Sequence, residues 1–347
     1  MLLAIFALIA GLIVLVWSAD RFIDGAVATA AYAGMPPLLI GMVVIGFGTS
    51  APEMLVSAIA ALQGNPALAL GNALGSNIAN IGLILGITAL LSPILVQRSV
   101  LLKELPLLLG ITAVFTALLI DGDVSRLDAW IMVAVFAATM AYSIVSAMKK
   151  ARQDRKDQED SVIHTSAVAD DGVVIVDGKA IELSRRAALW WLVLGLVLLT
   201  ASSRVVVYGA VSLATSFGVS DVIVGLTVVA VGTSLPELAA AIAAVKKNEH
   251  DLALGNVVGS NMFNTLLVVG IAGLIQPMEL ASEVIVRDLP VMIGFTVLLF
   301  LMSISLKPAS HGTAGRIGRV KGGALTSFWV LYTCYLVYIA FLQPLGR

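Results

Sequence analysis

Two stretches of this chain repeat one another 184 positions apart: Gly48-Thr49-Ser50-Ala51-Pro52-Glu53 and Gly232-Thr233-Ser234-Leu235-Pro236-Glu237. Aligning residues 46–86 with residues 230–270 at that offset gives 17 identities in 41 positions without a gap. The same offset carries residues 103–106 onto residues 287–290. Self-similarity at one fixed offset indicates a duplicated structural unit. The repeat therefore covers a whole half of the chain and is more than a local motif.

The composition is that of a membrane protein. Of the 347 residues, 59% are apolar and 12% are charged, whereas soluble domains average roughly 45–50% and 25%. Residues 1–17 lack the basic segment and cleavage pattern of a signal peptide, so we interpret them as part of a first span. The sequence predicts an all-α polytopic membrane protein with ten transmembrane helices. The predicted spans are 2–18, 37–61, 67–92, 104–120, 127–148, 187–208, 220–245, 252–275, 289–306 and 323–342.

The ten spans divide into two halves of opposite orientation. Each half has five spans, an odd number, so equivalent residues cross the membrane in opposite directions. We expect residues 1–148 to form the first five-helix repeat, residues 187–347 the second, and residues 149–186 a linker. Two inverted five-helix repeats are typical of secondary transporters, which bind their substrate near the membrane midplane between the repeats.

Basic residues predict the orientation of the chain. Cytoplasmic loops are enriched in Lys and Arg, and 17 of the 21 basic residues fall in connections on one side of the spans. We therefore expect both termini outside, the 149–186 loop in the cytoplasm, and the chain in the plasma (inner) membrane. Within that loop, residues 173–183 predict a β-hairpin with an Asp-Gly turn. Charged residues near span ends are interpreted as interfacial anchors: Asp20, Arg21, Asp24 and Arg204.

Glu53 and Glu237 are the candidate functional residues. Each lies within an apolar span, where a charged side chain costs about 2.5–3.5 kcal/mol on insertion scales. No Lys or Arg occupies the middle of either span to neutralise them. Two carboxylates that face one another at the repeat axis resist ionisation unless a cation lies between them. The duplicated acids therefore predict a cation site.

Each copy of the motif surrounds its glutamate with further oxygens. Thr49 and Ser50 precede Glu53 by four and three residues, so hydroxyl and carboxylate oxygens share one helix face. Pro52 and Pro236 lack an N–H group and are expected to break their helices and free backbone carbonyls. Ca2+ takes about 6–8 oxygen ligands. The next span of each half adds a polar stripe with a four-residue period, Asn72, Ser76 and Asn80 in the first half and Asn256, Ser260 and Asn264 in the second.

Other classes of function lack the residues that they need. No His or Cys lies near the motifs, which argues against a Zn2+ or Cu+ site. The sequence shows no combination of a nucleophile with a base that would indicate an enzyme, and no cofactor is expected. The 21 basic and 22 acidic residues nearly balance, so no nucleic-acid partner is indicated. The lone Cys334 excludes an intramolecular disulfide. The expected partners are the lipid bilayer and the transported ions, and no protein partner is evident.

Packing is the alternative explanation for the small and polar residues. A single Ser, Thr, Asn or Gly in a membrane helix usually serves helix packing or interhelical hydrogen bonding. Packing does not explain why an acid recurs beside Pro, Thr and Ser in both halves. We therefore interpret Glu53 and Glu237 as functional.

The paired Gly-Thr-Ser-x-Pro-Glu and Gly-Ser-Asn-x-x-Asn segments resemble the two alpha repeats of the cation/Ca2+ exchanger superfamily, and most closely its prokaryotic Na+/Ca2+ exchangers. The resemblance covers essentially the whole chain. It implies that the first and sixth spans are long, tilted helices that slide across the other eight. It also implies an ion site made of Glu53, Glu237, Thr49, Ser50, Thr233, Ser234, Ser76, Asn80, Ser260 and Asn264, with the carbonyls of Gly46 and Ala230.

The identity of the second ion remains open between Na+ and H+. Antiport of Ca2+ against Na+ is favoured because hydroxyl and amide oxygens are needed to coordinate Na+ and are superfluous for protons. The alternative is H+/Ca2+ antiport, with Glu53 and Glu237 as proton carriers. Potassium-dependent relatives carry an acid at the position of Asn264, so the amide here argues against K+ co-transport.

Overall fold

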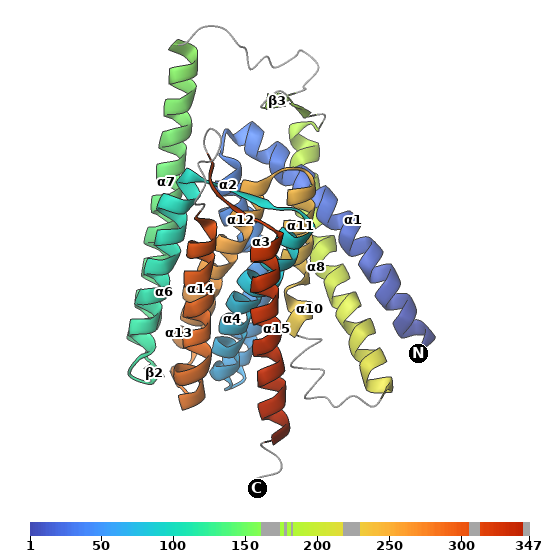
Figure 1. The fold of residues 1–347 in the computed structure, drawn as a ribbon, viewed down its shortest axis with the longest axis vertical. Coiled ribbons are helices and arrows are strands. Elements are labelled where there is room, and N and C mark those ends of the chain that lie inside the picture. The colour runs from blue at the N-terminus through green and yellow to red at the C-terminus, as the bar shows by residue number, and fades with distance from the viewer. Residues whose placement is uncertain (161–173, 177–178, 182, 218–229, 305–312, 343–347) are drawn as a thin grey trace.

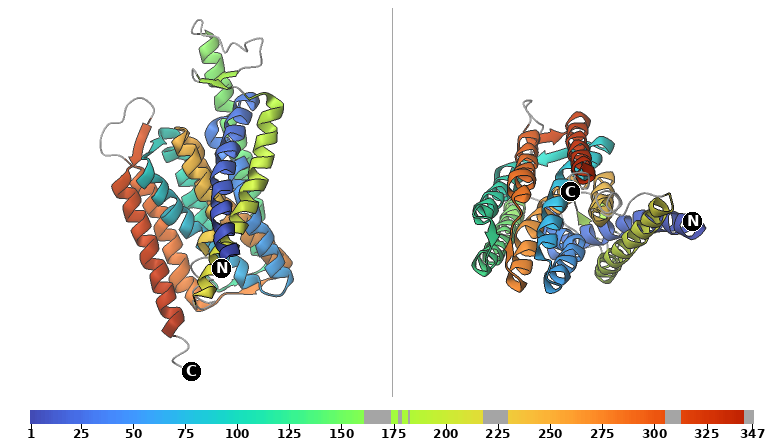
Figure 2. Two further views of the ribbon diagram at one scale, coloured as in Figure 1. Left: turned by 90° about the vertical axis from the view of Figure 1, so that its right-hand side faces the viewer. Right: turned by 90° about the horizontal axis from the view of Figure 1, so that it is seen from below.

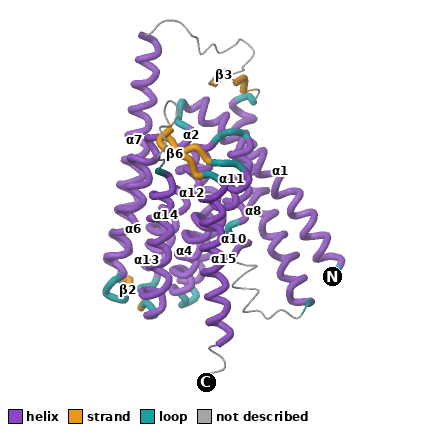
Figure 3. Tube along the Cα trace, in the orientation of Figure 1, coloured by secondary structure: helices purple, strands orange, loops and turns teal. Residues whose placement is uncertain are grey.

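The structure is a computed structural model that describes residues 1–347 except 161–173, 177–178, 182, 218–229, 305–312 and 343–347. It is a helical bundle with short strands at its two ends (Figures 1 and 3). The elements of the first half are α1 (Leu2–Ala33), α2 (Pro37–Leu39), η1 (Ile40–Ile45), α3 (Gly46–Leu62), α4 (Pro66–Ala79), η2 (Asn80–Leu85), α5 (Gly86–Leu91), β1 (Ile94–Gln97), η3 (Val100–Glu104), α6 (Leu105–Leu119), β2 (Asp123–Val124) and α7 (Arg126–Asp160).

The second half repeats these elements nearly residue for residue. Helices 66–91 and 100–119 of the first half return as 250–275 and 284–303, each shifted by the 184 positions of the sequence repeat. A hairpin of β3 (Val174–Val176) and β4 (Lys179–Ile181) precedes this half. The further elements are α8 (Arg185–Ser216), α10 (Ala230–Thr233), α11 (Leu235–Lys246), α12 (His250–Met262), η5 (Phe263–Val268), α13 (Val269–Ile275), β5 (Met278–Glu279), η6 (Val284–Asp288), α14 (Leu289–Ser303), β6 (Thr313–Ile317) and α15 (Arg319–Leu342).

The short strands show that the two halves are inverted relative to one another. β1 pairs antiparallel with β6, and β2 pairs antiparallel with β5. β1 and β5 occupy equivalent positions in their halves, yet the β1–β6 pair and the β2–β5 pair lie at opposite ends of the bundle (Figure 3). The chain therefore forms an all-α membrane fold of two inverted five-helix repeats, with each strand pair joining one half to the other.

Nine helices in the described part of the chain are long and apolar enough to cross a membrane. They confirm nine of the ten predicted spans. Residues 218–229, at the start of the predicted span 220–245, lie outside the described residues, and the rest of that span is α10 and α11. The β3–β4 register confirms the predicted hairpin, although its turn residues, 177–178, are outside the described part.

The predicted ends of three spans were wrong, and one of them is the end at residue 148, because α7 continues to Asp160. The first helix runs to Ala33 and not to residue 18, and the sixth runs to Ser216 and not to residue 208. Each has 32 residues, which at about 1.5 Å per residue is nearly 50 Å, well beyond the hydrocarbon thickness of about 30 Å. Asp20 and Asp24, which indicated the end of the first span, lie within α1, where Lys247 contacts them.

α1 and α8 form an arm that stands beside the other helices (Figures 1 and 2). Glycines at their crossings bring the two backbones together. A Cβ atom on Gly25 would lie 2.4 Å from the backbone nitrogen of Leu192, and one on Gly209 would lie 2.8 Å from that of Leu8. Gly25 and Gly209 are 184 positions apart, as are Leu8 and Leu192. The crossing therefore obeys the two-fold symmetry of the repeat.

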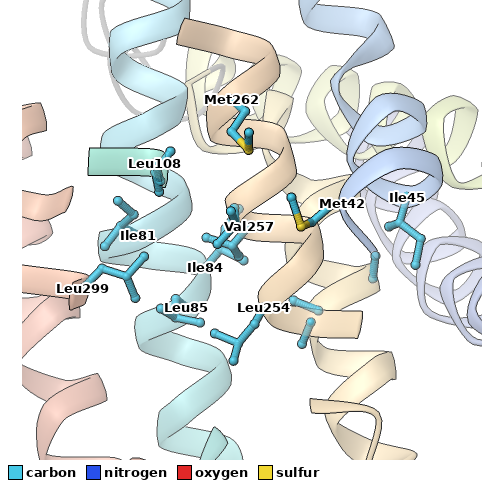
Figure 4. Close-up of a cluster of buried hydrophobic side chains, with 14 of the residues drawn as sticks. Met42, Ile45, Ile81, Ile84, Leu85, Leu108, Leu254, Val257, Met262 and Leu299 are labelled. Carbon is cyan, nitrogen blue, oxygen red and sulfur yellow. The ribbon is translucent and has the colours of Figure 1, made fainter. Parts of the chain in front are cut away.

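The remaining helices bury an apolar core around the spans that carry the repeated motifs. Figure 4 shows Met42 and Ile45 of η1, Ile84 of η2, and Leu254 and Val257 of α12 packed together. All five side chains are at most 1% exposed. This packing fixes α3, α4 and α12 relative to one another, and these helices position the polar side chains described next.

Candidate ion site

The first glutamate lies on α3 among buried polar side chains. Thr49, Ser50 and Glu53 are 0%, 0% and 3% exposed. At the start of α3, Gly46 packs so closely on α12 that a Cβ atom there would lie 3.1 Å from the Ser260 nitrogen. α3 therefore presents its motif to the interior of the protein and not to lipid.

The second glutamate lies at the start of α11. Ser234 interrupts the helix between α10 and α11, and Pro236 occupies the first turn of α11, where a missing N–H costs nothing. Ser234 and Glu237 are 2% and 3% exposed, and Thr233 is half-buried. Ala230 begins α10. The expected break in the chain at the second motif is therefore confirmed.

The expected break at the first motif was wrong. α3 continues from Gly46 to Leu62 with Pro52 inside it. A proline removes one backbone hydrogen bond, here that of the Gly48 carbonyl, without forcing the chain to leave the helix when the flanking turns are well packed. The helix widens instead just before the motif, in the π-helical turns of η1.

The polar stripes lie on the adjacent helices of the two halves. Ser76 and Asn80 are 6% and 1% exposed, and Ser260 and Asn264 are 0% and 1% exposed. Asn80 is the first residue of η2, and Asn264 is the second residue of η5. π-Helical turns are rare and occur frequently at functional sites.

Hydrogen bonds of the motif residues join the two halves and also link the helices of the second half. The Thr49 hydroxyl oxygen lies 3.2 Å from Oδ1 of Asn256 and 3.5 Å from the Ser260 hydroxyl. Nδ2 of Asn256 donates to the carbonyl of Glu237 at 3.3 Å. In the other direction, Nδ2 of Asn80 donates to Oδ1 of Asn261 at 3.0 Å. The motifs therefore meet at one place, although they lie far apart in the sequence.

Glu53 and Glu237 face this meeting point from opposite halves. The charge of Glu53 acts on the Glu237 carboxyl, and Thr49 contacts the same carboxyl. Neither glutamate belongs to an ion pair within the part of the chain that the structure describes. Two nearby carboxylates without a basic partner in a low-dielectric interior attract a cation strongly.

Several oxygens on the helices that carry the motifs lack any partner among the described residues. They are Ser50 Oγ, Glu53 Oε2, Glu237 Oε2, Asn77 Oδ1, Asn80 Oδ1 and Asn264 Oδ1, all buried. A buried polar atom without a hydrogen bond costs about 1–3 kcal/mol, so such a group of oxygens indicates a ligand that they can bind. The described residues hold no cluster of three or more His, Cys, Asp or Glu side chains. Hydroxyl and amide oxygens must therefore complete a site for hard cations.

A cavity of about 170 Å3 leads to Glu53 between α3, α8 and α10. Its lining includes Asn72, Thr233 and Arg204, and the neighbouring Ser203 hydroxyl donates to the Gly232 carbonyl at 3.0 Å. The interpretation of Arg204 as only an interfacial anchor was therefore incomplete, because this exposed arginine also lines the path to the glutamate.

Asn77 and Asn261 were missed as members of the polar network. Nδ2 of Asn77 donates to the Thr265 hydroxyl at 2.7 Å, and Asn261 accepts from Asn80. Their signal was in the repeated Gly-Ser-Asn triplets, where each asparagine follows a predicted serine ligand. The four-residue period of the stripe excluded them, because they lie on the neighbouring face of the helix, towards the other half.

Such an arrangement of two inverted halves around a shared pair of buried carboxylates is that of a secondary cation transporter. The comparison with known proteins gives the family. The family model of the sodium/calcium exchanger protein matches residues 3–145 and 187–338, and the chain belongs to this family of cation/Ca2+ antiporters.

Relatives match along nearly the whole chain. The "Putative antiporter CaxA" of Alkalimonas amylolytica is 40% identical over 97% of this chain and 99% of that protein. The "Sodium/calcium exchanger MaX1" of Methanosarcina acetivorans is 30% identical over 96% of this chain and 98% of that protein. A solved structure of the sodium-calcium exchanger NCX_Mj superposes with a TM-score of 0.76 at 27% identity, covering 95% of this chain and 98% of that one. The predicted family and fold class are therefore confirmed.

Proposed function

We propose that this protein exchanges Ca2+ for Na+ by alternating access at a midplane site between its two halves. The observation that carries the proposal is the buried pair of Glu53 and Glu237, which come from opposite halves and have no basic partner among the described residues. One Ca2+ neutralises two carboxylates, and so do two Na+ ions, whereas without a cation the buried pair resists ionisation. The ion ligands proposed beside the glutamates are Thr49, Ser50, Thr233, Ser234, Ser76, Asn80, Ser260 and Asn264, with the carbonyls of Gly46 and Ala230.

The neutral oxygens support Na+ as the second ion. Ser50, Asn80 and Asn264 each present a buried oxygen without a partner among the described residues. A monovalent metal ion that has lost its water inside a membrane needs several oxygens, whereas a proton needs one carboxylate. Na+ bound in the place of Ca2+ would be coordinated by these oxygens, whereas proton exchange gives them no role.

Flux into vesicles tests the coupling ion. The purified protein is reconstituted, and Ca2+ uptake is measured while a gradient of Na+, K+ or pH is imposed separately. We expect uptake to follow the Na+ gradient alone. Uptake that ignores Na+ and follows pH would assign the second ion as H+ at the same two glutamates.

Ser76→Ala and Ser260→Ala should weaken the activation of Ca2+ flux by Na+. Each removes a buried hydroxyl that we propose as an ion ligand, and a lost ligand costs on the order of 1–3 kcal/mol when its partner stays unsatisfied. The Na+ concentration for half-maximal activation should therefore rise by about fivefold or more, with a smaller change for Ca2+. Ser303→Ala is the matched control, because the buried Ser303 hydroxyl donates to the Leu299 carbonyl of its own helix. Equal Na+ activation in all three variants would remove these serines from the site.

The proposed topology places the termini outside and residues 149–186 in the cytoplasm of a plasma (inner) membrane protein. On this proposal, residues 1–148 and 187–347 are the two transport repeats, and residues 149–186 are a solvated linker between them. In the structure α1 begins at the β2 end of the bundle, opposite to β3 (Figure 1).

Single cysteines should report this orientation in a Cys334→Ser background. Gln153 is an exposed residue of α7, and Asp121 is an exposed residue of the turn before β2 at the other end. A membrane-impermeant thiol reagent added to intact cells should label Asp121→Cys and spare Gln153→Cys. The opposite pattern would invert the topology.

A further inference from the structure

Lys247, at the end of α11, binds two carboxylates of α1. Its Nζ lies 2.8 Å from Oδ1 of Asp20 and 2.7 Å from Oδ1 of Asp24. The lysine side chain is 27% exposed, and that of Asp24 is 31% exposed. Burial by itself lowers the pKa of the Lys247 ammonium. The hydrogen bonds and charges of Asp20 and Asp24 outweigh burial, so this pKa lies above its usual range.

These three residues join parts of the protein that differ in their role. α11 carries Glu237 of the proposed ion site in its first turn. α1 belongs instead to the arm formed by α1 and α8. Asp20 and Asp24 are four residues apart on one face of α1, where two carboxylates repel one another unless a cation lies between them. Lys247 lies between the two carboxylates, and Arg21 of α1 adds a longer contact of 3.9 Å to Asp24. Arg21 moves with α1, so a movement of α1 past α11 removes the Lys247 contacts alone.

The equivalent positions at the other face carry no such cluster. The repeat maps Asp20, Asp24 and Lys247 onto Arg204, Tyr208 and Gln63. An arginine, a tyrosine and a glutamine cannot form this ion pair. That face is also the one where the cavity of about 170 Å3, lined by Arg204, reaches Glu53. The two faces therefore differ in charge although their backbones are related by symmetry.

We propose that Lys247, Asp20 and Asp24 form an ionic latch that holds the cytoplasmic face closed and biases the transporter towards its outward-open state. The proposal rests on the alternating access put forward above. In an exact repeat the inward-open and outward-open states would have equal energies. A contact present at one face only shifts that equilibrium by its own free energy, and the ligand affinities measured from the two sides shift with it.

A buried cysteine on α11 measures how often the cytoplasmic face opens. Ala240 is 1% exposed and follows Glu237 by three residues in the direction of Lys247. Ala240→Cys, in a Cys334→Ser background, is labelled with an impermeant thiol reagent from the cytoplasmic side of inside-out vesicles. This readout requires no ion flux, so failure of the latch and failure of Na+/Ca2+ exchange can be told apart.

Lys247→Gln should raise the labelling rate of Ala240→Cys by about fivefold, the effect of losing a partly exposed ion pair. Lys246→Gln is the matched control, because it removes the neighbouring exposed charge outside the latch. Lys247→Arg keeps the pairing and should label at the parent rate. Adding Asp20→Asn and Asp24→Asn to Lys247→Gln should cause no further increase, because the contact is already gone.

Equal labelling rates in Lys247→Gln and Lys246→Gln would overturn the proposal. So would a further increase when both aspartates are changed in the Lys247→Gln background, because the carboxylates would then act independently of the lysine. If Lys247→Gln does not accumulate as folded protein, Asp24→Asn replaces it. That variant leaves Lys247 its bond to Asp20, so its labelling rate should lie between the parent and the full effect, and an unchanged rate would count against the latch.

Discussion

Glu53→Gln and Glu237→Gln should each abolish Ca2+ flux while the protein still inserts and folds. Each change keeps the size of the side chain and removes one of the two buried carboxylate charges. Losing one partner of a buried charge interaction costs about 3–5 kcal/mol, so flux at a given Ca2+ concentration should fall by about 100-fold or more. The measurement is Ca2+ uptake into vesicles, normalised to the amount of reconstituted protein.

The folded protein itself should not suffer from these changes. In the absence of ions the paired carboxyls resist ionisation, so a neutral amide of the same size leaves no buried charge that the parent fold depends on. Thermal unfolding in ion-free buffer should therefore occur at the parent temperature or above it, whereas the stabilisation by added Ca2+ should disappear. This combination separates loss of a ligand from loss of the fold.

Glu104→Gln is the matched control for both glutamates. Glu104 also lies within a spanning helix and has a buried oxygen without a partner among the described residues. It is the last residue of η3, just before α6, and lies outside the proposed site. Flux in Glu104→Gln should stay within about twofold of the parent, since substitutions away from such sites rarely exceed about 0.5 kcal/mol. Near-parent flux in Glu53→Gln or Glu237→Gln would remove the glutamates from the centre of the mechanism.

The sequence predicted the fold because duplication and membrane insertion both leave linear signals. A fixed offset relates Gly25 to Gly209 and the helix 66–91 to the helix 250–275, and the structure has the same offset in its element boundaries. The glutamates could be found for the same reason, because an acid within an apolar span is visible without any knowledge of its neighbours. These signals need no tertiary information.

Features that depend on contacts between distant segments could not be predicted. The π-helical turns at Asn80 and Asn264 arise from hydrogen-bond spacing that no residue type specifies. The continuation of α1 past residue 18 depends on partners such as Lys247, which is 223 residues from Asp24. Pro52 reads as a helix break in isolation, but the packing around α3 keeps the helix intact. Each of these differences is a case of tertiary packing overriding local preference.

Gly259→Ala should cause the second large loss, although it changes one hydrogen atom to a methyl group. A Cβ atom at this position would lie 2.3 Å from the Met42 carbonyl oxygen and 2.7 Å from the Met42 Cα. Both are backbone atoms, so no side chain can rotate away, and α12 and η1 must separate. Ser260, the next residue on α12, would then move away from Thr49, from which it is 3.5 Å distant at present.

The sign of the stability change decides whether close packing or helix propensity dominates at this position. Alanine favours a helix over glycine by about 1 kcal/mol, whereas overpacking a filled interface costs about 1–3 kcal/mol and at times more. Backbone overlap at 2.3 Å lies at the severe end, so we expect Gly259→Ala to lower the unfolding temperature and to reduce flux by about tenfold or more. Gly110→Ala is the control, since a Cβ atom there meets no described atom within 4 Å and only the helix preference acts. The prediction fails if Gly259→Ala unfolds at the same temperature as Gly110→Ala or at a higher one. In that case α12 and η1 do not pack as closely as the structure has them, and the contact between Thr49 and Ser260 does not depend on this glycine.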